Sequence, residues 1–321
     1  MILTLTPNPS IDQTLVLSEP LRPGSVQRAT QVFSVAGGKG INISRACRSA
    51  GVDTLAVFPC ADADPFLRLL HDIDVPHHAV HMPDTVRTNT TVTTPGGETT
   101  KLNGPGPTLS APILAELERV LIDAAAHADA VILAGSLPQG TPEDWYVTLI
   151  AKLRSKAPDL LIAVDSSDGP LRALANGLEC GVAPSLLKPN GLELGQLIGA
   201  DGEALEAAAQ RGEYAAVVEA AKDLVRRGIT EVLVSLGAAG AALVTEHDAW
   251  IATPPRIECV STVGAGDSTL AGYVMSRTTG ADHAQALKTA VAYGAAAASL
   301  PGTAIPTPND LHLDGATVAK F

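Results

Sequence analysis

Residues 111–134 read APILAELERVLIDAAAHADAVILA, and this stretch decides the fold class. From Ala111 to Ala126 the apolar residues recur as they do in an amphipathic helix, and Ala130 to Leu133 is a short apolar run typical of a buried strand. Strands that are apolar on both faces are characteristic of parallel sheets covered by helices on each side. The stretch therefore predicts one helix–strand unit of an α/β protein.

The same alternation continues on both sides of this unit. Downstream there are two more helix–strand pairs and a short strand: Pro142 to Ser155 with Leu160 to Val164, Tyr214 to Arg227 with Glu231 to Ser235, and Leu186-Leu187. Upstream, Ile2 to Thr6 is an apolar run that ends at Pro7. We expect residues 1–321 to form one α/β domain with three layers, in which helices cover both faces of a mainly parallel sheet.

Two segments, about 12–36 and 87–103, do not follow this alternation. The first contains the strand patterns Thr14 to Leu17 and Gln27 to Val35. The second reads as a hairpin in which Pro95-Gly96-Gly97 joins two Thr-rich strands. Ligands of α/β proteins bind beyond the carboxyl ends of the strands. We therefore expect these segments to form a small β-sheet that projects there and acts as a lid.

Composition excludes several classes of protein. The formal net charge is −12 and there is no basic cluster, which argues against nucleic-acid binding. The four cysteines are scattered without a CxxC pair, as expected of reduced thiols in a cytoplasmic protein. The N-terminus lacks the pattern of a signal peptide, and no run is apolar enough to suggest a membrane span.

The clearest functional motif is Ser261-Thr262-Val263-Gly264-Ala265-Gly266-Asp267-Ser268, between a strand-like run, Ile257 to Val260, and an apolar helix. Gly264, Ala265 and Gly266 would turn the chain sharply and present backbone N–H groups to an anion at the helix start. Asp267 beside such a site suits a base that accepts a proton from an attacking hydroxyl during phosphoryl transfer. The motif alone also allows Asp267 to be a helix cap.

A second glycine turn into a helix is Ala36-Gly37-Gly38-Lys39-Gly40-Ile41-Asn42. Lys39 at a helix start is disfavoured by the helix dipole, and a bound anion would explain it. A surface lysine at a frayed helix end is the alternative. The segment is not a Walker A loop, because the first Gly of that motif is missing and Gly40 replaces its Ser or Thr.

Lys188-Pro189-Asn190-Gly191-Leu192-Glu193 follows the short strand Leu186-Leu187. Asn190 and Glu193 would lie on one face of a helix start, where both could reach hydrated Mg²⁺. A helix cap with Glu at its favoured end is the alternative.

Weaker signals complete the candidate set. Asp12, after the first strand, could bind sugar hydroxyls, and Arg28 and Arg87 in the predicted lid could each hold a phosphate. Each is equally compatible with an ordinary turn or surface residue. The turn from Ser235 to Ala241, with Gly237 and Gly240, predicts either a close approach to a nucleotide or a simple hairpin.

Taken together and in this order, from Asn8 to about Pro306, these motifs resemble those of the ribokinase-like PfkB family of sugar kinases. Ala134-Gly135-Ser136-Leu137-Pro138 and Val164-Asp165-Ser166-Ser167 also fit the family. The resemblance implies ATP and Mg²⁺ as cofactors and a homodimer formed through the lid sheets. It implies the following roles: Asp267 as base; Gly264, Ala265 and Gly266 as anion site; Asp12, Gly38 and Asn42 on the sugar; Lys39, Arg87 and Arg28 on its phosphate; Lys188, Ser235, Gly237 and Gly240 near ATP; Asn190 and Glu193 near Mg²⁺.

Within the family, four features resemble the branch of 1-phosphofructokinases and tagatose-6-phosphate kinases: Leu5-Thr6-Pro7-Asn8-Pro9, Lys39, Arg87-Thr88-Asn89 and Asn103-Gly104-Pro105-Gly106-Pro107. This implies phosphorylation of fructose 1-phosphate to fructose 1,6-bisphosphate, with tagatose 6-phosphate or fructose 6-phosphate as the alternative acceptor. One segment departs from the family: Pro59-Cys60-Ala61-Asp62-Ala63-Asp64-Pro65 stands where relatives often carry Gly-x-Asp-x-x-Gly.

The motifs argue against two other classes of protein. A sugar-phosphate sensor without activity would be expected to lack the acid or the anion turn, and both are present. A nicotinamide-dependent oxidoreductase requires G-x-G-x-x-G after an early strand and an acidic residue about 20 positions later, and this pattern is missing.

Overall fold

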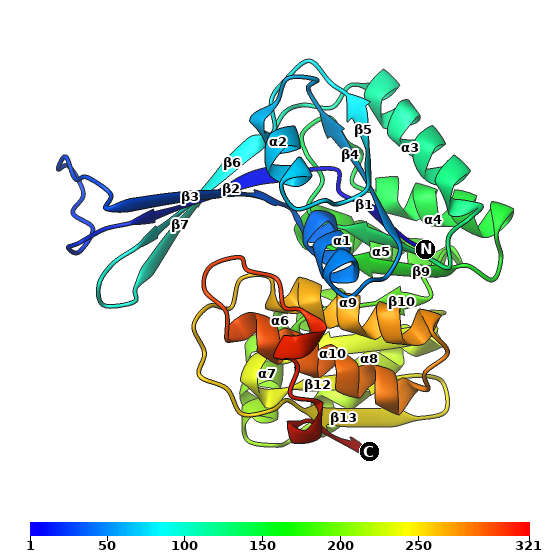
Figure 1. The fold of residues 1–321 in the computed structure, drawn as a ribbon. Helices are drawn as coiled ribbons and strands as arrows, with labels where there is room; N and C mark the ends of the chain where they lie inside the picture. The colour runs from blue at the N-terminus through cyan, green and yellow to red at the C-terminus, as the bar shows by residue number, and fades with distance from the viewer.

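The computed structural model describes residues 1–321 and contains a large and a small β-sheet (Figure 1). The large sheet has ten strands in the order β14-β13-β12-β11-β10-β9-β8-β1-β4-β5. Its parallel part consists of β5 (His77–His81), β4 (Thr54–Cys60), β1 (Ile2–Leu5), β8 (Ala130–Ala134), β9 (Leu161–Asp165), β10 (Leu186–Leu187) and β11 (Glu231–Ser235). The antiparallel strands β12 (Ala241–Val244), β13 (Ala249–Thr253) and β14 (Thr317–Lys320) complete one edge.

Helices cover both faces of this sheet. One face packs against α1 (Lys39–Ser49), α9 (Ala265–Thr278) and α10 (His283–Ala298). The other packs against α3 (Ala111–Ala125), α4 (Trp145–Lys156), α5 (Asp168–Glu179), α6 (Gly191–Ile198), α7 (Gly202–Gln210) and α8 (Ala215–Arg226). The predicted three-layer α/β/α architecture is confirmed.

The two apolar layers follow from the alternation of side chains along each strand. In β1, Leu3 and Leu5 belong to the core on the α3 side, whereas Ile2 belongs to the core on the α1 side. All three side chains are essentially inaccessible to solvent. A strand buried on both faces has no polar face, and this explains why β1 and β8 read as continuous apolar runs.

The small sheet consists of β3 (Gln31–Gly37), β2 (Ser10–Val16), β6 (Arg87–Thr93) and β7 (Thr99–Asn103), in that order. It projects from one side of the molecule, and α2 (Pro65–His71) lies at its root (Figure 1). Val32 and Phe33 are adjacent in β3 and both more than half exposed, so both faces of the edge strand are open to solvent. No helix in the chain has both the length and the apolar character needed to cross a bilayer.

One predicted element is wrong. Ile257 to Val260 was expected to be a strand before the glycine turn, but it is irregular and largely exposed. Its backbone bonds explain the difference, because the N–H groups of Val260 and Ser261 donate to the carbonyl of Ala298 at the end of α10 instead of to a strand. The segment therefore ties the glycine turn to α10.

Candidate active site

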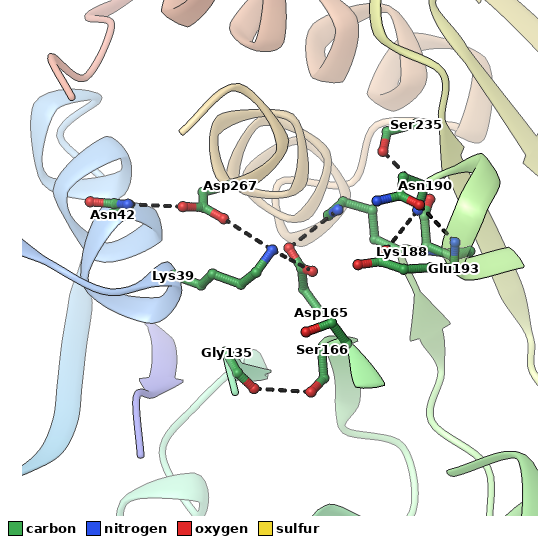
Figure 2. A network of polar contacts seen from close by, with 12 residues as sticks. Lys39, Asn42, Gly135, Asp165, Ser166, Lys188, Asn190, Glu193, Ser235 and Asp267 are labelled. Carbon is green, nitrogen blue, oxygen red and sulfur yellow. Dashed lines mark hydrogen bonds and ion pairs between the residues drawn. The ribbon is translucent and has the colours of Figure 1, made fainter. Parts of the chain in front are cut away.

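Polar side chains gather where the parallel strands end. Asp165 is the last residue of β9, Lys188 directly follows β10, and Ser235 is the last residue of β11. The helix starts of α1 and α9 bring Lys39 and Asp267 to the same place (Figure 2). The carboxyl edge of a parallel sheet is the usual ligand site of α/β proteins.

Asp165 is the centre of this group. Its carboxylate is inaccessible to solvent and lies between two lysines, with Lys39 Nζ 3.0 Å from Oδ1 and Lys188 Nζ 3.2 Å from Oδ2. Burial alone would raise the pKa of Asp165, but Lys188 and Lys39 outweigh it and hold the pKa below its usual range. Asp165 is therefore a permanent anion at neutral pH.

Asp267 lies on the other side of Lys39. Its Oδ1 is 3.7 Å from Lys39 Nζ, and its Oδ2 accepts a 2.9 Å hydrogen bond from Nδ2 of Asn42. Burial raises the pKa of Asp267, and Lys39 counteracts this only in part. A carboxylate with a raised pKa and a nearby cation is suited to accept a proton.

The helix-capping alternative for Asp267 does not occur. The N-cap of α9 is Gly264, whose φ of 76° is left-handed, and no side chain accepts a bond from the first turn. The N–H groups of Gly266 and Asp267 have no acceptor within the chain. The turn therefore presents free donors beside Asp267, as an anion site requires.

Lys39 points toward the carboxylates of Asp165 and Asp267 but remains partly accessible to solvent. Its side chain is about one-third exposed, at 35 %, whereas that of Lys188 is 4 % exposed. Burial would lower the pKa of Lys39, but Asp165 and Asp267 outweigh it and raise the pKa. The structure thus places Lys39 with the predicted base, and the charges of two lysines and two aspartates cancel.

Asn190 and Glu193 form a capping box at the start of α6. Asn190 Oδ1 accepts from the N–H of Glu193, and Glu193 Oε2 accepts from the N–H of Asn190. The capping alternative is therefore realised, but it leaves Oε1 of Glu193 without a partner. Burial raises the pKa of Glu193, and the nearby Asp165 adds to this effect. A free carboxylate oxygen short of positive charge fits a hydrated Mg²⁺, although no group of three potential ligands is assembled.

Ser235, Gly237 and Gly240 form the turn of the β11–β12 hairpin. Gly240 has a φ of 96°, and a Cβ there would lie 1.9 Å from the carbonyl oxygen of Ala252. The close approach that requires glycine at this position is therefore to β13. Gly237, with a φ of 56°, borders open space instead.

A second polar group lies at the root of the small sheet. Asp12 Oδ1 accepts hydrogen bonds from Ser10 Oγ at 2.8 Å and Asn89 Nδ2 at 3.0 Å. Gly37 leaves room for this carboxylate, because a Cβ at position 37 would lie 2.2 Å from Asp12 Oδ2. Gly38, the left-handed N-cap of α1, joins this root to the helix that carries Lys39 and Asn42.

Arg87 belongs to the same group. Its Nη1 donates to the carbonyl of Gly104 at 3.3 Å, and its Nε is buried without a partner. Burial lowers the pKa of Arg87, and Asp12 counteracts this. The buried Oδ1 atoms of Asn89 and of Asn8 are also without a partner. Buried polar atoms without partners in the chain are suited to bind a polar ligand.

Arg28 is not part of either group. It is exposed and lies in the connection between β2 and β3, at the end of the small sheet far from the large one (Figure 1). The sequence motifs give no role to Asp165, which the structure places at the centre of the polar group. Its position at the end of a buried strand is the signal in the sequence that could have indicated it.

The model of the pfkB family of carbohydrate kinases matches residues 6–310. The chain belongs to this family. It is 35 % identical to 1-phosphofructokinase of Haloferax volcanii, over 99 % of each chain. It is 33 % identical to 1-phosphofructokinase of Escherichia coli K12, over 91 % of this chain and 89 % of that protein.

A solved structure of phosphofructokinase-2 from Escherichia coli, in complex with substrates and products, superposes with a TM-score of 0.83. It is 29 % identical and 96 % of each chain is covered. The predicted family and fold are confirmed, and the protein is a carbohydrate kinase that uses ATP.

The Asp165 ion pairs generate a stability prediction. Asp165→Asn leaves two lysines facing a neutral side chain, and we expect the free energy of unfolding to fall by about 3–5 kcal/mol at pH 7. Urea denaturation would measure it, with the exposed Asp72→Asn as a control that should change stability by less than about 0.5 kcal/mol.

The pH dependence of this loss has a definite sign. Since the pKa of Asp165 is depressed in the folded state, its contribution is present at neutral pH and disappears as the pH falls through that pKa. The difference in the free energy of unfolding between wild type and Asp165→Asn should therefore become smaller in acid. A loss below about 1 kcal/mol at pH 7 would contradict the role given to this ion pair.

Proposed function

We propose that this kinase transfers the γ-phosphoryl group of ATP to the free hydroxyl of fructose 1-phosphate and yields fructose 1,6-bisphosphate. The observation that carries the proposal is the juxtaposition of Asp267, Lys39 and the free N–H groups of the α9 turn. The named relatives of this chain are 1-phosphofructokinases, which supports the choice of acceptor. Tagatose 6-phosphate and fructose 6-phosphate are the alternative acceptors.

The residues of the large sheet would perform the transfer. The acceptor hydroxyl lies against Asp267, which takes its proton as the new O–P bond forms and the bond to the β-phosphate breaks. The N–H groups of Gly266 and Asp267 and the ammonium of Lys39 receive the negative charge on the transferred group. Asn42 holds the Asp267 carboxylate in position through its 2.9 Å hydrogen bond.

The nucleotide would lie along the ends of β10 and β11, beside Gly237 and Ser235. Lys188 would keep Asp165 ionised beside the nucleotide. Because its side chain is buried, its ammonium group stays close to Asp165. Asn190 and Glu193 would hold Mg²⁺ through water, and the ion supplies charge neutralisation to the ATP phosphates. We assign the metal contact to Glu193 Oε1, since the capping box leaves that oxygen free.

The small sheet would act as the lid and hold the sugar phosphate. Asp12 and Gly38 lie at its root and would contact sugar hydroxyls. Arg87, whose Nε lacks a partner, would hold the phosphate already present on the sugar. Lys39 faces the transfer centre instead, so we assign it to the incoming phosphoryl group rather than to that phosphate.

The lid would also form a homodimer interface. Five of the eight large apolar side chains that are exposed lie in its segments: Leu21, Val26, Val32, Phe33 and Leu102. An exposed edge strand with apolar residues is a template for association. Arg28, at the far end of the sheet, would reach a sugar phosphate only in the partner subunit. Cytoplasmic location stays a prediction from the sequence.

Substrate choice is tested by ADP release with Mg²⁺ and ATP. We expect kcat/KM for fructose 1-phosphate to exceed the values for fructose 6-phosphate and tagatose 6-phosphate at least tenfold, about 1.4 kcal/mol of transition-state discrimination. A preference for either 6-phosphate would contradict fructose 1-phosphate as the acceptor but would still agree with phosphoryl transfer from ATP. ATP binding without turnover on any of the three would contradict phosphoryl transfer to a ketose phosphate.

The assignment of the base is tested by Asp267→Asn, which retains an oxygen for Asn42. We expect kcat to fall about 10²–10⁴-fold while ATP binding persists. Burial raises the pKa of Asp267, so the charged carboxylate costs stability at neutral pH and the variant should melt at the same or a higher temperature.

The pH profile provides a second readout of Asp267. Because the base must be unprotonated, wild-type kcat/KM should fall as the pH drops through the pKa of Asp267. Burial raises this pKa above the usual aspartate value of about 3.9. Asp72→Asn should keep the wild-type profile. Turnover of Asp267→Asn within threefold of wild type would rule out its role as base.

Dimerisation is tested by light scattering after size exclusion. We expect wild type to have twice the 32.9 kDa mass of the chain and Phe33→Asp to shift it toward the monomer. Phe321→Asp is the matched control, since Phe321 is similarly exposed at 58 % but lies at the C-terminus. A monomeric wild-type protein at micromolar concentration would disprove the interface.

A further inference from the structure

We infer that Asp64 is a positioning residue that sets the place of Arg87 at the root of the small sheet. The inference rests on the proposed role of Arg87 toward the phosphate of the sugar. Asp64 lies in the segment that departs from the family pattern, Pro59 to Pro65, and it is remote from the Asp267 centre in sequence. Its two carboxylate oxygens have separate partners on two different elements.

The first partner is the helix that Asp64 begins. Asp64 is the N-cap of α2, and Oδ1 accepts a 2.8 Å hydrogen bond from the N–H of Phe66. Pro65 at the first helical position supports the same start, because it needs no hydrogen-bond acceptor for its nitrogen. Phe66 and Leu70 of this helix are fully buried in the main core. The position of Asp64 is thus fixed by the large domain.

The second partner belongs to the small sheet. Oδ2 of Asp64 accepts a 2.8 Å hydrogen bond from the N–H of Val86, directly before Arg87, the first residue of β6. Both residues of this bond are buried, with Asp64 4 % and Val86 6 % exposed. α2 also packs against β3, so the helix and its N-cap contact the small sheet both at β3 and at the residue before β6 (Figure 1).

Arg87 depends on this anchor because its own contacts are few. Its guanidinium has one hydrogen bond to a backbone carbonyl, at 3.3 Å, and a buried Nε without a partner. No other hydrogen bond or ion pair fixes the direction of the side chain, so its placement follows the backbone, which is held by pairing with β2 and by the hydrogen bond at Val86. A shift of that backbone moves Arg87 relative to the base, which stands on a different element.

Asp64→Asn separates the two functions of the carboxylate. The amide oxygen can still cap Phe66, but the amide nitrogen is a donor and cannot accept from Val86. We expect KM for the sugar phosphate to rise about tenfold, while kcat and KM for ATP stay within twofold. Asp282→Asn is the matched control, since Asp282 caps α10 through Gln285 alone and has no contact with the small sheet.

A double-mutant cycle with Arg87→Ala identifies the route of the effect. If Asp64 acts through Arg87, Asp64→Asn should raise KM for the sugar phosphate less than twofold in the Arg87→Ala background. An undiminished effect in that background, a loss of kcat, or an unchanged KM in the single variant would each overturn the inference. Asp64→Ser, which also caps but has one oxygen, replaces Asp64→Asn if that variant does not fold.

The same cycle separates this inference from the proposed function. If Arg87→Ala alone leaves KM for the sugar phosphate unchanged, the phosphate role of Arg87 fails. If Arg87→Ala raises KM and Asp64→Asn does not, only the positioning role of Asp64 fails.

Discussion

A single buried carboxylate holds the candidate active site together. Asp165 is fully inaccessible to solvent, and an isolated charge there would be very costly, so its two lysines are structural requirements. Lys39 stands at the start of α1 and Lys188 follows β10, so the ion pairs join segments separated by about half of the chain. Through Lys39 the arrangement extends to Asp267 on α9. The placement of Asp267, the proposed base, is therefore tied to how one buried anion is neutralised.

This balance also explains how the centre can receive an anion. The two lysines and two aspartates cancel, and the remaining field comes from the helix starts of α1 and α9, whose first turns are not capped by side chains. Free N–H donors can therefore bind a phosphoryl group. When no phosphoryl group is bound, the buried charges of the protein still balance. Asp165 and Asp267 are both buried carboxylates, but their pKa values shift in opposite directions. Lys188 and Lys39 lower the pKa of Asp165, whereas burial raises the pKa of Asp267 because Lys39, which it shares with Asp165, offsets burial only in part.

The residues proposed for transfer and those proposed for recognition of the sugar phosphate lie in different parts of the chain. The large sheet and its helices carry the first set, while the small sheet carries Asp12 and Arg87 of the second. The two parts meet at Gly37-Gly38 and at the Asp64–Val86 hydrogen bond. Residues beside these junctions can therefore alter binding of the proposed acceptor without contacting it. The segment from Pro59 to Pro65, which departs from the family pattern, lies at such a junction.

The sequence by itself determined the three-layer fold, the family and the two glycine turns, because these depend on local periodicity and on the conformational freedom of Gly38 and Gly264. It missed the irregular run from Ile257 to Val260, whose apolar residues suggest a strand but whose N–H groups bond to α10. It assigned Lys39 to the phosphate already on the sugar, a role that stays a prediction, and it gave Asp165 no role. Only the tertiary structure brought Lys39, Asp165, Lys188 and Asp267 together, since charge pairing between α1, β9, β10 and α9 depends on distances across the folded chain. No spacing along the sequence encodes those distances.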